Sequence, residues 1–300
     1  MPNPTTSNRR AHIDLNYSHN RRSHSIHYNE TKFYTVPTSS CIVTKGDDMK
    51  TRLFINNEKF IAGITVKDNT AFEQNNMALH VCHNTDQIIE NRAQLAATLG
   101  CSINDFVCAN QTHSANFYKV TASEKGRGAT NHATAIPNTD AMYTFEQNIV
   151  LSSFTADCVP ITITNEASGL IAVVHSGWQG TVKEITLKLL QHLVNEENCP
   201  AKHFNIHIGA ALSQEKFEVD EDVYMKFKHL RYADEFMYYN SETKKYHIDN
   251  QLTVKKQCEL VGVPCNQITI DTTCTFKSED GFSYREDRQT GRHLTFIMKK

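Results

Sequence analysis

The sequence has no long apolar segment, and this absence excludes one class of protein. Its longest apolar runs, such as Leu170–Val174, are far shorter than the stretch of about 20 residues that a membrane-spanning helix needs. The first 30 residues also lack the apolar region of a secretory signal peptide. We therefore expect neither a membrane protein nor a secreted one.

The sequence also has no marked excess of either charge. It contains 31 Lys and Arg against 33 Asp and Glu, with a formal net charge of −2. A protein that binds nucleic acid or an anionic membrane surface through its overall charge carries a basic excess. We therefore expect no nucleic-acid partner and no membrane partner, and the composition leaves the oligomeric state open.

No C-x-x-C motif occurs among the nine cysteines. This excludes a zinc ribbon and a thioredoxin-like redox site, which both use that spacing. The number of cysteines is odd and there is no secretion signal, so we expect free thiols in a reducing compartment. These observations predict a cytoplasmic protein.

The first 48 residues differ in composition from the rest of the chain. They are rich in Asn, Ser, Arg and His and show neither helical nor strand periodicity. Such a segment cannot bury enough apolar surface to fold. We therefore expect residues 1–48 to be a disordered N-terminal extension and residues 49–300 to form a single domain without repeats or linkers.

Two segments carry helix signals. Residues 85–100, TDQIIENRAQLAATLG, place Asp86 at the expected N-cap position and apolar residues on one face. Residues 181–200 begin with a T-x-x-E pattern, formed by Thr181 and Glu184. This pattern is typical of a capping box at the start of a helix.

Five further segments have the composition of strands and are bounded by turn residues. They are Ile149–Phe154, Val159–Thr164, Leu170–His175, Phe204–Ile208 and Gln267–Ile270. Strands and helices mix along the chain, with a hairpin in the middle. This order favours an α+β fold, with mixed β-sheets in a layered sandwich and helices outside, over a purely parallel doubly wound sheet.

The predicted hairpin brings a thiol and an imidazole to the same end of two strands. Cys158 precedes the first strand, His175 ends the second, and the turn-forming sequence NEASG connects them. The sequence does not fix the register, so it leaves open whether both side chains share a face. Asp157 adjoins Cys158 and is a candidate to orient an imidazole.

A third candidate, His113, lies in the polar loop CANQTHSANF. Taken singly, His113, Cys158 and His175 are more simply explained as structural residues. Together they offer two nitrogens and one sulfur and leave a fourth position open, as catalytic zinc sites do. The glycine loop SGWQG after His175 leads to the predicted helix start at Thr181, which is a candidate anion site, although packing explains the loop equally well.

Seven motifs occur in the order found in one known family. Between Gly63 and Ile297 the chain resembles the multicopper polyphenol oxidase (laccase-domain) family, which is now generally described as purine nucleoside phosphorylases with adenosine deaminase activity. The motifs are NQTHS, NTDAMY, TADCVP, HSGWQG, HIGAAL, KFEVDEDV and CTFKSEDGFSYREDRQTGR.

The resemblance implies an α+β sandwich and a zinc or copper ion held by His113, Cys158 and His175. It also implies that adenosine, inosine or methylthioadenosine reacts with phosphate to give the base and ribose 1-phosphate, and that adenosine is deaminated. Either reaction needs a group that moves protons, and Asp157 and Asp140 are our candidates beside the catalytic Cys158.

Four residues are candidates for binding the substrates. Arg285, Arg292 and Lys67 offer positive charge to phosphate, and Trp178 offers a ring to a purine. Surface ion pairs and loop packing explain the same residues without a ligand. The chain also departs from the family pattern here, because Gln179 and Glu286 stand where the family often has arginine, and Lys67 stands in for an arginine next to a missing glycine pair.

Three other functions remain open from the sequence. The first is a copper-dependent polyphenol oxidase, although no H-x-H pair of a multicopper centre occurs. The second is a non-catalytic, metal-stabilised interaction protein. The third is a cysteine hydrolase with Cys158 as nucleophile and His175 as base.

Overall fold

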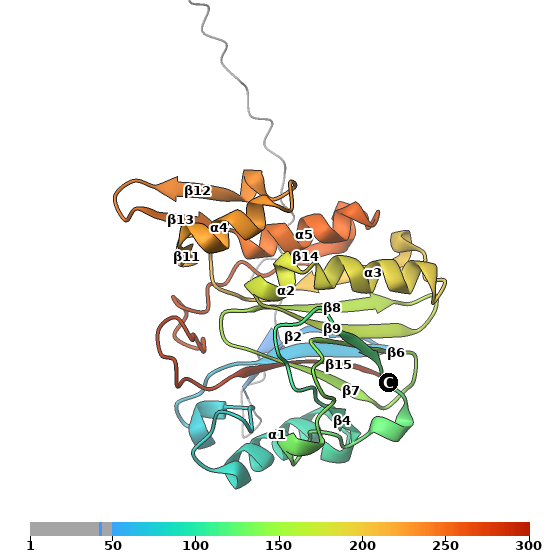
Figure 1. Ribbon diagram of the computed structural model, residues 1–300. Coiled ribbons are helices and arrows are strands. Elements are labelled where there is room, and N and C mark those ends of the chain that lie inside the picture. The colour runs from blue at the N-terminus through green and yellow to red at the C-terminus, as the bar shows by residue number, and fades with distance from the viewer. Residues whose placement is uncertain (1–41, 44–49) are drawn as a thin grey trace, which may run out of the picture. The chain divides into compact units, whose positions relative to one another are not determined.

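Two six-stranded sheets form the centre of the protein, shown as a computed structural model in Figure 1. The structure describes residues 42–43 and 50–300, which belong to one compact unit. The expectation of disorder for residues 1–48 differs from the structure at Ile42–Val43, which form a short strand. The remainder of that segment lies outside the described residues.

The first sheet is antiparallel except for one parallel pair, β4 with β7. In spatial order its strands are β1 (Ile42–Val43), β2 (Thr51–Asn56), β3 (Phe60–Thr65), β15 (His293–Lys299), β7 (Val150–Thr155) and β4 (Phe106–Val107). The sheet therefore joins segments from both ends of the described chain.

The second sheet is mixed, with parallel pairs at both of its edges. Its strands are β14 (Ile268–Ile270), β10 (Asn205–Ile208), β8 (Val159–Asn165), β9 (Leu170–Ser176), β6 (Ala141–Thr144) and β5 (Phe117–Lys119). A third, smaller sheet contains β11 (Glu218–Val219), β13 (Lys245–Ile248) and β12 (Met237–Asn240).

Helices cover the outer faces of the two large sheets (Figure 1). The α-helices are α1 (Thr85–Leu99), α2 (Trp178–Val182), α3 (Ile185–Asn195), α4 (Glu221–Lys228) and α5 (Asn250–Leu260). Short 3₁₀-helices are η2 (Phe72–Asn75), η3 (Ile103–Asp105), η4 (Ala122–Glu124), η5 (His132–Thr134), η6 (Ala201–His203), η7 (Asp234–Phe236) and η8 (Cys265–Gln267). Among the described residues, no helix combines the length and the apolar character of a membrane span.

Strand β9 shows how alternation along one strand builds the layers. Leu170, Ala172 and Val174 pack in the cluster that contains residues of α3 and α5. Ile171 and Val173 pack in the cluster between the two large sheets. Because successive side chains of a strand point to opposite faces, β9 contributes to two cores at once. Helix α1 packs with the opposite face of the first sheet, and the predicted α+β layered sandwich is confirmed.

The five strands predicted from composition are all present, with each range shifted at one end or both by a single residue. They are β7, β8, β9, β10 and β14. The first predicted helix is also present as α1, but its N-cap is Asn84 and not Asp86. The Asn84 side chain accepts a hydrogen bond of 2.9 Å from the Asp86 backbone N–H.

The helix predicted from Thr181 is wrong in its start and its capping box. Thr181 lies inside α2, and its hydroxyl donates back to the Gly177 carbonyl oxygen at 3.2 Å, a local bond that competes with capping. Glu184 has a left-handed backbone with φ of 63° and separates α2 from α3. Because Thr181 is fully buried, the anion site expected at a helix start there is wrong as well.

Candidate metal centre

The register of the β8–β9 hairpin answers the question left open by the sequence. Pro160 pairs with His175 in the antiparallel ladder, and Cys158 lies two positions before Pro160. Residues two positions apart on a strand point to the same face, so Cys158 lies on the face of Pro160 and its partner His175. The ligand atoms of Cys158, His175 and His113 all lie within 4.8 Å of one another, so the three residues form one cluster as predicted.

The cluster is compact and partly open. The Cys158 Sγ lies 3.8 Å from His113 Nε2, and the rings of His113 and His175 meet edge to face with 4.8 Å between their centroids. His175 is buried, whereas His113 and Cys158 are partly exposed. The cluster is therefore less enclosed at His113 and Cys158 than at His175.

Gly177 leaves space beside two of these side chains. A Cβ atom at this position would lie 2.6 Å from His113 Cδ2 and 2.9 Å from Cys158 Sγ, closer than carbon and sulfur can approach. The close approach, and not a special backbone angle, therefore requires glycine in the HSGWQG motif.

Asp140 fixes two of the candidate ligands. Its carboxylate accepts a 2.8 Å hydrogen bond from His175 Nδ1. It also accepts the backbone N–H groups of Thr112, His113 and Ser114, at 3.2, 3.0 and 2.7 Å. His175 therefore presents Nε2 to the cluster, in the arrangement by which carboxylates orient metal-binding histidines. The sequence pointed to Asp157 for this contact, and the structure assigns it to Asp140.

The charges in the cluster favour a thiolate. Burial opposes ionisation of Cys158, but the nearby charge of His175 and hydrogen bonds from His113 and His175 lower the pKa of the thiol to about 6. Burial raises the pKa of Asp140, but the hydrogen bonds from His175 and Ser114 lower it to about 2. Two imidazoles and a thiolate are the donors that zinc and copper accept, so the residues fit such an ion.

Asp157 has a different set of contacts. It has a left-handed backbone with φ of 82°. Its carboxylate accepts hydrogen bonds from the Thr275 hydroxyl at 2.6 Å and from the Arg285 backbone N–H at 2.7 Å. Asp157 therefore connects the segment before Cys158 to the C-terminal loop. The proton-transfer roles of Asp157 and Asp140 and the catalytic role of Cys158 stay predictions.

Two residues that the sequence analysis did not single out hold the His113 loop. The Gln111 side chain donates to the Phe154 carbonyl oxygen and accepts the Phe154 N–H, both at 2.8 Å, so it extends the end of β7. Lys183 Nζ donates to the His113 carbonyl oxygen at 2.6 Å. The Q-x-H spacing was the one signal that could have identified Gln111.

Three of the four predicted substrate-binding residues lie near the cluster. Trp178 directly follows Gly177 and has the Lys226 ammonium 5.7 Å from its ring centroid. Arg285 lies next to Asp157 through its backbone and donates from Nη2 to the Glu218 carbonyl oxygen at 3.1 Å.

Arg292 is within electrostatic reach of the thiol. Its guanidinium lies 5.7 Å from the Tyr284 ring centroid. Burial lowers the pKa of Arg292, whereas the charges of Cys158, Tyr284 and Asp157 raise it. An anion bound near Cys158 would therefore meet a cation that is already in place.

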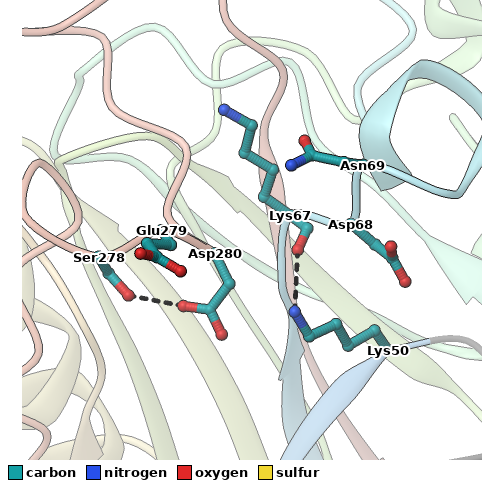
Figure 2. A pocket seen from close by; sticks show the side chains of 7 residues that line it. All are labelled: Lys50, Lys67, Asp68, Asn69, Ser278, Glu279 and Asp280. Carbon is teal, nitrogen blue, oxygen red and sulfur yellow. Dashed lines mark hydrogen bonds between the residues drawn. The ribbon is translucent and has the colours of Figure 1, made fainter.

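Lys67 lies in a separate cavity of about 500 Å³ whose lining includes none of the three cluster residues (Figure 2). Lys50 Nζ approaches the Lys67 carbonyl oxygen at 3.5 Å, and Ser278 donates to Asp280. The cavity is lined by Lys50, Lys67, Asp68, Asn69, Ser278, Glu279 and Asp280.

The fold and the cluster together define the class of this protein. It is an α+β sandwich that carries a candidate His–Cys–His metal site at the open end of the β8–β9 hairpin. Residues 63–300 match the family described as multi-copper polyphenol oxidoreductase laccase. The chain belongs to this family, which confirms the resemblance drawn from its motifs.

Several proteins of known name are similar to this chain over most of its length. It is 32% identical to purine nucleoside phosphorylase YlmD of Geobacillus stearothermophilus, over 80% of this chain and 90% of that protein. It is 27% identical to adenosine deaminase RL5 of an unknown prokaryotic organism, over 78% and 90%. The crystal structure of YlmD from Geobacillus stearothermophilus matches with a TM-score of 0.80 at 28% identity, covering 87% of this chain and 99% of that one.

Proposed function

We propose that the protein is a zinc-dependent purine nucleoside phosphorylase that also deaminates adenosine. The observation that carries the proposal is the cluster of His113, Cys158 and His175, with a thiolate and an oriented imidazole. The names of the relatives support purine nucleosides as the substrate class. The eight described cysteines are free thiols, which supports the cytoplasmic location that we propose.

The residues around the cluster prepare it for an ion. Asp140 holds His175 by Nδ1 and the His113 loop by its backbone, so the His175 ring keeps its orientation and the backbone at His113 keeps its position. Gly177 keeps the adjoining space free. Zinc, when bound, would supply a Lewis acid that activates water or polarises a substrate atom at neutral pH.

Positively charged side chains next to the cluster are suited to bind phosphate. Arg292 and Arg285 are the groups that we assign to it, and Trp178 is the ring that we assign to the purine. Charge-assisted hydrogen bonds from arginine are stronger than neutral ones and suit a phosphate. Lys67, in its separate cavity, is the weakest of the four proposals.

The different contacts of Asp140 and Asp157 favour different roles for the two carboxylates. Asp140 is engaged by His175 and by three backbone N–H groups, so we assign it to positioning as well as to the proton-transfer role that the sequence predicts. Asp157 accepts one hydrogen bond on each oxygen. It retains lone pairs for a proton and is our first candidate for proton transfer.

A copper-dependent polyphenol oxidase is the second candidate, because the family description names copper and polyphenols. Within residues 50–300, one group of three metal-ligating residues occurs, whereas a multicopper centre needs several copper sites. Copper binds nitrogen and sulfur ligands tightly in any protein. Copper retention alone would therefore not support the oxidase.

The test is adenosine turnover by zinc-loaded protein, with and without phosphate, with the products separated. Adenine and ribose 1-phosphate formed only with phosphate support the phosphorylase, and inosine supports the deaminase. Cys158→Ala is expected to abolish turnover, whereas Cys265→Ala, at an exposed thiol, is the matched control. No product with zinc bound, together with oxygen consumption on a phenol by copper-loaded protein, would overturn the proposal in favour of the oxidase.

A further inference from the structure

A pair of histidines lies near the metal cluster without belonging to it. His80, in the loop between η2 and α1, remains accessible to solvent. The centroid of its ring lies 5.4 Å from that of His132 and 6.4 Å from that of Phe154, which it meets edge to face. The Phe154 backbone is bound through both its N–H and its carbonyl oxygen by Gln111, two positions before His113. The two histidines therefore lie next to the segment that carries a candidate ligand.

Backbone contacts fix the His80 loop to the segment that contains Arg292. The Arg292 N–H donates to Asn76 Oδ1 at 2.9 Å, and the Met77 N–H donates to the Arg292 carbonyl oxygen at 3.1 Å. The buried Arg92 donates from Nε to the Met77 carbonyl oxygen at 2.9 Å. Because these bonds hold the start of the loop from two sides, His80 has a defined position relative to Arg292.

The Arg292 guanidinium has donors that the fold does not use. Its Nη1 donates to the carbonyl oxygens of Thr290 and Gly291. Its Nε and Nη2 donate to no acceptor among the described residues. The carboxylate whose charge reaches Arg292, that of Asp157, already accepts two other hydrogen bonds. A guanidinium with two free donor positions is suited to hold an oxyanion by two oxygens.

The charges around His80 favour an anion over a cation. Loss of hydration against its neighbours lowers the pKa of His80 to about 4. Basic groups, first among them Arg292 and then His132, act in the same direction. Near pH 7 the ring is therefore neutral and offers one N–H donor. A cation beside it would be repelled by these basic groups, whereas an anion would be attracted.

We propose that His80 and Arg292 together form an oxyanion subsite beside the metal cluster, and that this subsite takes inorganic phosphate. The guanidinium of Arg292 holds two phosphate oxygens, and His80 donates its N–H to a third. His132 packs against the His80 ring and limits its movement. The identity of the anion as a co-substrate rests on the proposed function, whereas binding of the anion itself does not need a nucleoside.

Calorimetric titration of the zinc-loaded full chain with inorganic phosphate, without nucleoside, tests the subsite. His80→Ala should raise the phosphate dissociation constant about fivefold or more, because it removes a hydrogen bond to a charged group. His80→Lys supplies a charged donor in its place and should bind phosphate at least as tightly as the unmodified protein. His83→Ala, at an exposed histidine of the same loop, is the matched control and should leave the constant unchanged.

Two results of this titration would overturn the subsite. The first is equal phosphate affinity in His80→Ala and the unmodified protein at equal zinc content. The second is a further zinc ion per chain that is lost in His80→Ala, which would assign His80 and His132 to a second metal site.

Steady-state kinetics separate a failure of the subsite from a failure of the proposed function. If the protein carries out phosphorolysis, His80→Ala should raise the KM for phosphate about fivefold or more and leave the KM for adenosine unchanged. An unchanged KM for phosphate would overturn the subsite and leave the function in place. Phosphate binding that depends on His80 in a protein without phosphorolysis would overturn the function and support the subsite.

Discussion

Gly177 makes a sharp prediction at the scale of single residues. Gly177→Ala places a methyl group within 2.6 Å of the His113 ring and 2.9 Å of the Cys158 sulfur, so one of the two ligands must move. We expect a loss of zinc affinity of at least tenfold, with the fold kept, because misplaced ligands no longer meet one ion. Zinc titration against a chromophoric chelator measures this loss.

The matched control lies three residues further along. Gly180→Ala adds a methyl group whose nearest atom, Ile185 Cγ2, is 3.4 Å away, which is ordinary packing distance. Its zinc affinity should equal that of the unmodified protein. Equal affinities for the two alanine variants would show that the space beside His113 and Cys158 does not matter to metal binding.

Asp140 provides the second prediction at this scale. Asp140→Asn keeps the size of the side chain but removes its charge and replaces one acceptor oxygen by a donor NH₂ group. His175 then loses its fixed tautomer, and the backbone N–H groups of the His113 loop lose acceptors. We expect zinc affinity to fall about 10–100-fold, measured by the same titration.

The control for this variant is Asp222→Asn, an exposed carboxylate on α4. It carries the same change of charge far along the chain from the ligands and should leave zinc affinity unchanged. A similar loss in both variants would attribute the effect to overall charge and not to the contact with His175.

At the scale of elements, α1 tests which residue caps a helix. The Asn84 side chain accepts the Asp86 N–H, so Asn84→Ala should lower the free energy of unfolding by about 1 kcal/mol. Asp86→Ala removes only an acidic residue from the first turn, a smaller effect of about 0.3–1 kcal/mol. Urea unfolding of both variants compares them, and a larger loss in Asp86→Ala would contradict the assigned cap.

The differences between expected and observed elements have a local cause. The five strands were predictable because burial of both faces leaves continuous runs of β-branched residues, as in β8 and β9. The helix after the SGWQG loop was not, because Glu184 adopts a left-handed backbone that a T-x-x-E pattern does not reveal. Its carboxylate accepts a hydrogen bond from Tyr232 at 3.0 Å, a contact 48 positions away along the chain.

In the candidate site, too, some residues were predictable from the sequence and others depend on the fold. His113, Cys158 and His175 were predictable as a set because a hairpin and a motif identified them. The role of Asp140 depends on the fold, since β6 begins one residue after it and pairs with β9 so that Ala141 lies beside Val174. That pairing brings Asp140 next to His175, 35 positions along the chain, and no spacing rule predicts it.

At the scale of the whole molecule, histidines whose pKa is lowered by folding couple stability to pH. His293 is 3% exposed, accepts the Phe282 N–H at Nε2 and bonds the Thr65 carbonyl oxygen through Nδ1. Burial lowers the pKa of His293 to about 4. Burial likewise lowers the pKa of His207 to about 4, on a ring that stacks on Phe54. An unfolded histidine titrates near 6.5, so below that pH the unfolded chain binds protons that the folded one does not.

The free energy of unfolding of metal-free protein should therefore fall as the pH drops from 6.5 towards 4, by up to about 1.4 kcal/mol per pH unit for each such imidazole. His207→Phe keeps a ring on Phe54 and removes one proton site, so its slope against pH should be smaller by up to that amount. The control His203→Gln changes an exposed histidine and should leave the slope unchanged. Urea unfolding between pH 4.5 and 6 measures all three. The raised pKa of His175, about 9, contributes little slope at the acidic end of this range, and it contributes the same slope to all three proteins. Identical slopes in all three proteins would show that folding does not change the pKa of His207.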